Sequence, residues 1–243
     1  MMGISYLFLL TTIFIMISEV CFAGDPSPSR QLVDFNQYNP LEPAFSRGSL
    51  GLKVGIGLEE HQWREAPSLN RQIYAQPNSE TGRLELVNVY LHKGTPWPID
   101  LGIVLSQAID SEVSRLGSHL QWTFFEGFKL PSFGLRVAHS RIYGLNSTEV
   151  RSFQGDMVAD YSIFSYFTLF AKYSLGQHKI DQNFETQPSL RLDNDETFQS
   201  EFQDSSSLIG LQVRAWPGVG DLTFARTSSI VGARYLFKAS FGM

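Results

Sequence analysis

Polarity alternates from one residue to the next through much of this chain, and this alternation restricts the fold more than any other feature. In one stretch, Val54, Ile56 and Leu58 alternate with Lys53 and with glycines. A period of two residues predicts β-strands, because successive side chains of a strand point to opposite faces. In the segments with the strongest pattern, one face contains no Asp, Glu, Lys or Arg, whereas the other carries single charges among Gly and Ser.

Ten such segments of strand length follow one another, and bacterial single-chain barrels have an even number of strands. The sequence therefore predicts an all-β fold, an antiparallel up-and-down transmembrane β-barrel of about ten strands, with eight or twelve as alternatives. The predicted strands are residues 49–59, 83–92, 99–107, 118–127, 132–142, 153–164, 167–177, 206–216, 222–226 and 229–241.

Short and long connections alternate between these segments. Short periplasmic turns and long external loops are the usual asymmetry of such barrels, so we expect both termini of the barrel in the periplasm. Trp97 and Trp216 flank short turns, where aromatic rings favour the membrane surface. The longer connections, expected outside, are residues 60–82, 108–117, 143–152 and 178–205.

A soluble barrel of the lipocalin type would also alternate, with its apolar face inward. The polar face separates the two readings, because a water-facing sheet gains nothing from many glycines. In a narrow lumen, glycine makes room for a long opposing side chain. A Lys or Arg facing lipid at mid-depth costs about 2–4 kcal/mol, which explains a face free of charge. We therefore expect the apolar face to point to lipid.

The N-terminus predicts export. Residues 6–17 form an apolar run of signal-peptide length, and a small residue, Ala23, precedes the expected cleavage site. The alternatives are an uncleaved anchor and lipidation at Cys21. We expect residues 1–23 to be a signal peptide, residues 24–48 a periplasmic lead-in without regular structure, and residues 49–243 the barrel.

Removing residues 1–23 removes Cys21, the single cysteine, so the mature chain is expected to form no disulfide and no cysteine metal site. Acidic residues slightly outnumber basic ones, with 24 Asp and Glu against 19 Lys and Arg. The chain therefore lacks the basic footprint of nucleic-acid binding, and we expect no cofactor and no metal.

Charged residues on the polar face are candidates for the lumen lining. A barrel of about ten strands has a lumen largely filled by side chains, and enclosed charges need partners or water. Two interpretations stay open: a paired network that stiffens the barrel, and a narrow pore with a basic bias that favours small polar or anionic solutes. The candidates are Lys53, Asp100, Arg136, Asp156, Asp160, Lys172, Arg214, Arg234 and Lys238.

Histidine and carboxylate groups give a weak indication of chemistry. His139 and Ser140 are neighbours on a strand and point to opposite faces, so they form no catalytic pair with each other. His119 is expected in the lumen, and His61 and His178 in outer loops. The acidic loop at 178–205 lacks the spacing of a calcium site. We therefore expect no catalytic residue and no enzyme activity, with an outer-membrane hydrolase as the alternative.

Gly232, Tyr235 and Phe237 form a Gly-x-x-aromatic-x-aromatic pattern in the last predicted strand. This pattern resembles the assembly signal of small Gram-negative outer-membrane β-barrel proteins, an architectural class rather than one family. The resemblance implies export to the outer membrane and recognition by the barrel-assembly machinery. We also expect a monomer in contact with outer-membrane lipid and lipopolysaccharide. The expected role is a narrow porin-like channel or a structural barrel that displays loops. The alternatives are a lipid-modifying enzyme, or a surface binding module acting through loops 60–82 and 178–205.

Overall fold

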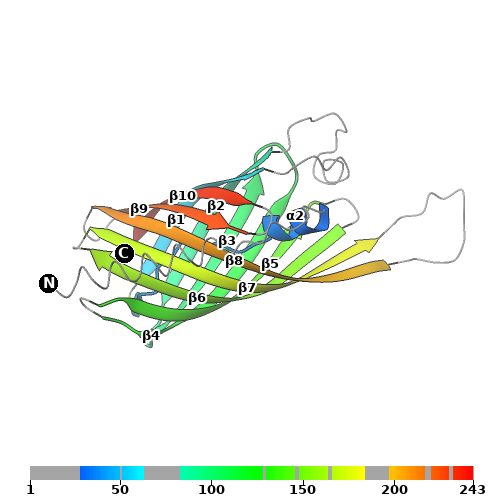
Figure 1. Ribbon diagram of the computed structural model, residues 1–243. Coiled ribbons are helices and arrows are strands. Elements are labelled where there is room, and N and C mark those ends of the chain that lie inside the picture. Colours follow the sequence, from blue (N-terminus) through cyan, green and yellow to red (C-terminus); the bar gives the residue numbers. More distant parts are fainter. Residues whose placement is uncertain are drawn as a thin grey trace, which may run out of the picture.

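Ten antiparallel strands close into one barrel in the computed structural model (Figure 1). The structure describes residues 28–49, 51–62, 83–127, 130–145, 148–163, 166–183, 197–216, 220–229 and 232–242. Each strand pairs with its neighbours in sequence, and β10 pairs with β1 to complete the circle. The predicted up-and-down barrel of about ten strands is confirmed.

The elements follow one another along the chain without crossovers. Their bounds are α2 (Pro28–Phe35), β1 (Leu52–Gln62), β2 (Arg83–Gly94), β3 (Ile99–Ala108), β4 (Ser114–Phe125), β5 (Ser132–Tyr143), β6 (Thr148–Ile163), β7 (Phe167–Asn183), β8 (Thr197–Trp216), β9 (Gly220–Ser228) and β10 (Ala233–Gly242).

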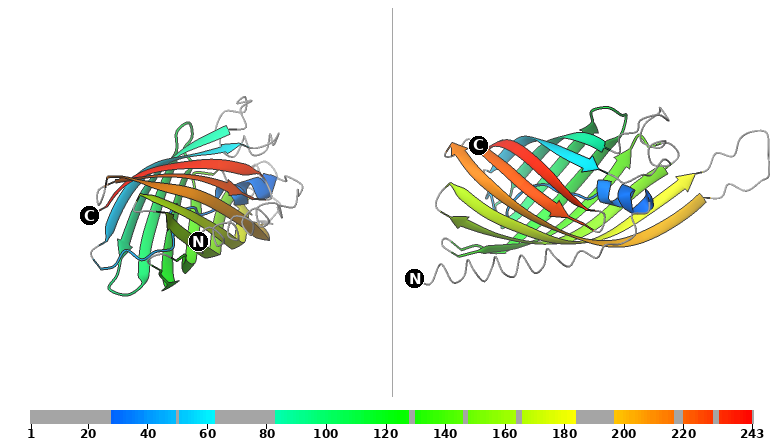
Figure 2. Two further views of the ribbon diagram at one scale, coloured as in Figure 1. Left: turned by 60° about the vertical axis from the view of Figure 1, so that its left-hand side comes forward. Right: turned by 45° about the horizontal axis from the view of Figure 1, so that its top comes forward.

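The two ends of the barrel differ. We call the turn end the one where β1 begins and β10 ends; the loop end is the opposite one (Figures 1 and 2). At the loop end, residues 109–113 join β3 to β4 and residues 144–147 join β5 to β6, so these two connections are shorter than predicted. Strands β6, β7 and β8 extend further toward the loop end than predicted, since pairing continues to the pair of Asn183 and Thr197. Much of the predicted loop 178–205 is therefore strand, and residues 184–196 lie outside the described residues. Pairing persists there without the alternation of apolar and polar residues that marked the rest of each strand.

The apolar face points outward and the charged face inward. Ile56, Leu175 and Met157 are 61%, 61% and 59% exposed, whereas Lys53 and Lys238 are 1% and 0% exposed. Strand alternation puts these two sets on opposite sides of the same wall. The direction of the apolar face agrees with the sequence prediction. Within the described ranges, no helix is long and apolar enough to cross a membrane.

Candidate functional site

The N-terminal segment before β1 runs through the lumen. We call residues 28–48 the luminal segment; α2 lies at the loop end, and the chain then passes down to Arg47 and Gly48 at the turn end (Figure 1). All side chains from 31 to 44 are buried. The expectation of a periplasmic lead-in without regular structure is wrong for these residues, because they form a helix and pack inside the wall. The prolines and mixed polar residues of residues 24–48 led to that expectation.

An apolar cluster holds α2 at the loop end. Leu32, Val33 and Phe35 from the helix are 1–2% exposed. Burying each such side chain is worth about 1.5–3 kcal/mol, which offsets the cost of fixing the helix inside the wall. Their wall partners are Leu84, Leu86, Ala108, Val113, Ile142, Val150 and Ile180.

Tyr38 anchors the middle of the luminal segment. Its hydroxyl lies 2.7 Å from Nδ1 of His119, which was expected in the lumen. Its ring lies over Gly117, where an added Cβ would come within 2.2 Å of the ring. Any larger residue at 117 would occupy the space of the ring, so this inward glycine makes room for the luminal segment.

Glu42 sits within a cage of cations near the turn end. Its carboxylate forms ion pairs with Lys238 and Arg47, and its Oε1 lies 3.6 Å from Nζ of Lys53 and 3.4 Å from Nε2 of His92. Glu42 is 4% exposed. A buried carboxylate is tolerated only with partners of this kind, so Glu42 fixes the luminal segment against β1, β2 and β10.

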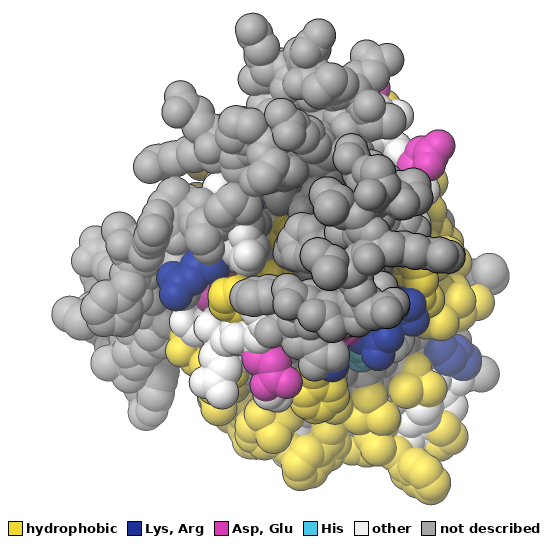
Figure 3. Space-filling model, turned by 90° about the vertical axis from the view of Figure 1, so that its right-hand side faces the viewer, with side chains coloured by type: hydrophobic (Ala, Val, Ile, Leu, Met, Phe, Trp, Pro, Cys, Tyr) yellow, Lys and Arg dark blue, Asp and Glu magenta, His cyan; other side chains and the backbone are white. Residues whose placement is uncertain are grey.

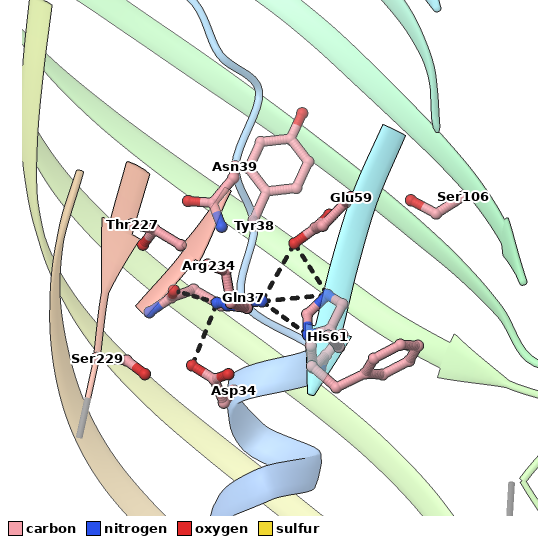
Figure 4. A network of polar contacts seen from close by, with 12 residues as sticks. Asp34, Gln37, Tyr38, Asn39, Glu59, His61, Ser106, Thr227, Ser229 and Arg234 are labelled. Atoms are coloured by element: carbon pink, nitrogen blue, oxygen red, sulfur yellow. Dashed lines mark hydrogen bonds and ion pairs between the residues drawn. The ribbon is translucent and has the colours of Figure 1, made fainter. Parts of the chain in front are cut away.

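Arg234 on β10 joins the helix to the wall at the loop end (Figure 4). Its Nη2 lies 3.2 Å from Oδ1 of Asp34 and 2.9 Å from Oε1 of Gln37, and its Nη1 lies 3.1 Å from Oε1 of Glu59. His61 completes the group, with its Nε2 3.0 Å from the Glu59 carboxylate. His61 therefore lies inside the barrel on β1, not in an outer loop as predicted.

Arg115 on β4 shares the same carboxylate. Its Nη2 donates to Glu59 at 2.7 Å, and its Nη1 donates to the carbonyls of Phe35 and Gln37 at 2.9 and 3.0 Å. Glu59 thus bridges two arginines, Arg115 through Oε2 and Arg234 through Oε1. Neither Glu59 nor Arg115 was among the predicted luminal residues. Arg115 had been assigned to the loop 108–117, and Glu59 to the end of the first strand. The available signal was the parity of Glu59, which matches that of Lys53 along β1.

Lys172 and Arg136 hold the backbone of the luminal segment. Lys172 Nζ donates to the Tyr38 carbonyl at 3.0 Å, and Arg136 Nη2 donates to the Glu42 carbonyl at 2.9 Å. Asp156 lies 3.7 Å from each of these two cations. The three groups form one buried network between wall and segment.

Two wall carboxylates accept backbone N–H groups of the luminal segment near the turn end. Asp160 accepts from Ala44 at 2.6 Å, and Asp100 accepts from Arg47 at 3.1 Å. These contacts satisfy donors of a segment that is not itself in a sheet.

Of the nine predicted luminal residues, eight are at most 5% exposed. The ninth, Arg214, has a 43% exposed side chain at the end of β8, where a register shift interrupts the strand, and its Nε lies 3.7 Å from Asp221. The structure thus brings most of the predicted charges together around a segment that the sequence had placed elsewhere.

Ser152 and His178 form a close pair beneath α2. Their Oγ and Nδ1 atoms are 2.6 Å apart, and Asn36 Nδ2 donates to the same Oγ at 2.6 Å. His178 is 1% exposed on β7, so its prediction as a loop residue is wrong. A serine this close to a histidine can act as a nucleophile with its base. Here, however, the Ser152 hydroxyl is buried and accepts a hydrogen bond from the side-chain amide of Asn36. The arrangement fastens the end of α2 to the wall.

The other predicted residues have simpler settings. Ser140 points inward and His139 outward, as the strand period predicted. Tyr235 and Phe237 face outward on β10, and Gly232 lies just before this strand. In the described part of the chain, no group of three or more His, Cys, Asp or Glu could hold a metal ion.

A shallow apolar groove of about 580 Å³ lies on the outer wall across β7 to β10, β1 and β2. Leu169, Leu211, Phe224 and Phe237 are among its lining residues. These four side chains belong to the outward face of the wall.

Comparisons with known proteins show a similar fold and no similar sequence. No family model matches the sequence, and no curated protein does so. The chain is similar to the KdgM porin (8% identity, TM-score 0.39, covering 78% of this chain and 99% of that chain). It is also similar to the NanC porin (12%, 0.37, 79% and 98%) and to Ail of Yersinia pestis (10%, 0.37, 79% and 93%). At these identities and TM-scores the matches assign no function to this chain.

Proposed function

We propose that this chain is an outer-membrane β-barrel whose lumen is closed by its own N-terminal segment, and that it acts as a structural barrel presenting its loop end rather than as an open pore. The observation that carries the proposal is the burial of every side chain from 31 to 44 inside the wall. A chain threaded along the axis occupies the path that a solute would take.

The outward face supports the membrane placement. On β6 the outward positions from Ile163 to Phe153 are apolar or glycine. Ten residue steps at about 3.3 Å, with a strand tilt of about 40°, give a band about 25 Å tall, which is the height of the apolar band in outer-membrane barrels. Exposed Trp97, Phe124 and Phe125 lie at the turn end, where aromatic rings favour the membrane surface.

The polar contacts between the luminal segment and the wall support a lumen that is held closed. Glu42 has three cationic side chains around it, and Arg234 and Arg115 each bond both wall and segment. Separating the luminal segment from the wall would leave several of these charges without partners, and each buried unpaired charge costs several kcal/mol. We therefore expect the closed state to persist at rest.

A non-catalytic role is part of the proposal. The Ser152–His178 pair is the strongest arrangement for hydrolysis among the described residues, and Asn36 covers it. With long loops outside, as in other barrels, α2 would lie at the cell-surface side. The loop end is then the face available to a partner.

Ion conductance in planar bilayers tests closure. We expect the intact protein to give no current above background, and a variant lacking residues 28–48 to conduct.

Folding must be checked beside conductance. Unheated samples of intact and shortened protein should both migrate as compact, heat-sensitive species on electrophoresis. A current in the intact, folded protein that equals that of the shortened form would overturn the proposal. Should the shortened form fail to fold, tethering position 38 to position 117 through a cysteine pair would serve instead. If the wild type conducts and the tethered variant does not, the luminal segment leaves the lumen at rest, and the proposal of a closed resting state is wrong.

A further inference from the structure

Three cations form a row on the outer wall near the loop end. Arg141 on β5 is the register partner of Arg151 on β6, which is in turn the partner of Lys179 on β7. The residues on either side of each in sequence are buried in the lumen, so these three side chains point outward. Strands lie about 4.8 Å apart, and the row therefore spans about 10 Å.

The row marks the end of the apolar band. On β6 the outward face is apolar or glycine from Ile163 to Phe153, and Arg151 is the next outward position. Viewed from the loop end, Lys and Arg side chains lie at the rim beside the apolar wall (Figure 3). A barrel seated with its apolar band in hydrocarbon would hold these three cations at the depth of the lipid headgroups.

Carboxylates lie on the side of this row away from the membrane. Glu149 Oε1 is 2.8 Å from Arg141 Nη2 and also pairs with Arg151, while Asp181 is 3.6 Å from Lys179. Glu149 and Asp181 are register partners one step further toward the loop end. They hold the cations in place, and a negative group approaching from the membrane side meets the cations first.

The cations keep capacity for a further ligand. The side chains of Arg141, Arg151 and Lys179 are 39%, 48% and 41% exposed. The guanidinium of Arg141 stacks on the ring of Tyr143 at 4.9 Å, which holds it at the wall. Glu201 on β8 ends the row as the partner of Lys179.

We propose that Arg141, Arg151 and Lys179 bind the phosphate groups of lipids in the leaflet beside the loop end. The planar fork of arginine matches two phosphate oxygens, and a neighbouring lysine adds a point charge. Basic clusters at the edge of an apolar surface are suited to anionic lipid headgroups. The lipid, rather than free phosphate, is the occupant because the row directly borders the apolar band. This inference rests on the membrane placement given in the proposed function.

Native mass spectrometry of the full-length protein in detergent, with bisphosphorylated lipid A added, tests the inference. We expect the Arg141→Gln/Arg151→Gln variant to bind this lipid about tenfold more weakly, as the loss of charge-assisted hydrogen bonds implies. The matched control is Lys93→Gln/Arg226→Gln, which removes the same charge from exposed positions on other parts of the wall and should bind as the wild type does. Lipid A without phosphates should bind to the wild type as weakly as to the first variant.

The result that overturns the inference is equal lipid binding by the Arg141→Gln/Arg151→Gln variant and the wild type, or equal loss in the control variant. Binding abolished by a metal chelator in all variants would also overturn it, in favour of carboxylates bridged by a divalent cation. Conductance and heat-dependent migration of the same samples report the closed barrel separately, so failure of lipid binding leaves the proposed function standing.

Discussion

Arg234 Nη2 lies 3.2 Å from Oδ1 of Asp34, and this contact joins residues 200 positions apart in the chain. Asp34 belongs to the first described helix and Arg234 to the strand that closes the barrel on β1. The luminal segment is therefore fastened to the last strand as well as to the first, and closure of the wall and filling of the lumen depend on each other.

Replacing Arg234 should destabilise the barrel strongly. Arg234→Met leaves Asp34 and Glu59 buried without one of their cations, and breaking such a buried pair costs about 3–5 kcal/mol. The temperature at which the compact species converts to the unfolded one on electrophoresis measures the effect. Arg214→Met is the matched control, because its side chain is 43% exposed, and it should melt with the wild type. Equal melting of both variants would contradict the network.

Glu42→Gln should loosen the luminal segment while keeping its size. The change removes the negative charge that Lys53, Lys238 and Arg47 share, and we expect brief current bursts in bilayers where the wild type is silent. Glu126→Gln removes one charge from an exposed position near the turn end and should stay silent. Silence of the Glu42 variant, in a folded sample, would show that apolar packing alone holds the segment.

Gly117→Ala should push the Tyr38 ring from its place. The added Cβ would lie 2.2 Å from that ring, and overpacking of this kind costs about 1–3 kcal/mol. Gly155→Ala, with nothing within 4 Å of the new Cβ, is the control. Adding Tyr38→Ala to the Gly117→Ala variant should recover part of the loss. If the stability losses of Gly117→Ala and Tyr38→Ala simply add in the double variant, the Tyr38 ring does not pack against Gly117.

Cysteine labelling should place α2 at the cell surface. Cys21 is the single natural cysteine and lies in the expected signal peptide. Arg30→Cys is exposed in α2 and Lys93→Cys is exposed at the turn end. On intact cells a membrane-impermeant maleimide should label position 30 alone, and permeabilised cells should label both. Labelling of position 93 alone on intact cells would show that the turn end, and not α2, lies at the cell surface.

Ser152→Ala should leave the lipids of the cell unchanged. The hydroxyl is covered by Asn36 and serves to hold α2, so lipid extracts from cells with wild-type and variant protein should show the same acylation. A difference that depends on Ser152 would favour the hydrolase alternative over a structural role.

The sequence alone determined the strands and their two faces. Lys53, Lys172 and Lys238 were recognised as enclosed because the strand period is local: each step of one residue reverses the direction of the side chain. The same local rule gave the ten segments, and the glycines of the polar face with the absence of charge from the other face gave the direction of the apolar wall. Arg214 departed from it because a register shift at the end of β8 interrupts the period.

Only the tertiary structure decided what fills the lumen. Glu42 lies in a stretch without period, and its partners come from β1, β2 and β10, so no short pattern could reveal them. Which charges meet depends on strand register and on closure of the barrel, and both are set by pairings across the whole chain. Apolar residues at inward positions, such as Tyr90, Phe170 and Leu236, were the one sign in the sequence that the lumen holds protein, since they need a partner other than water.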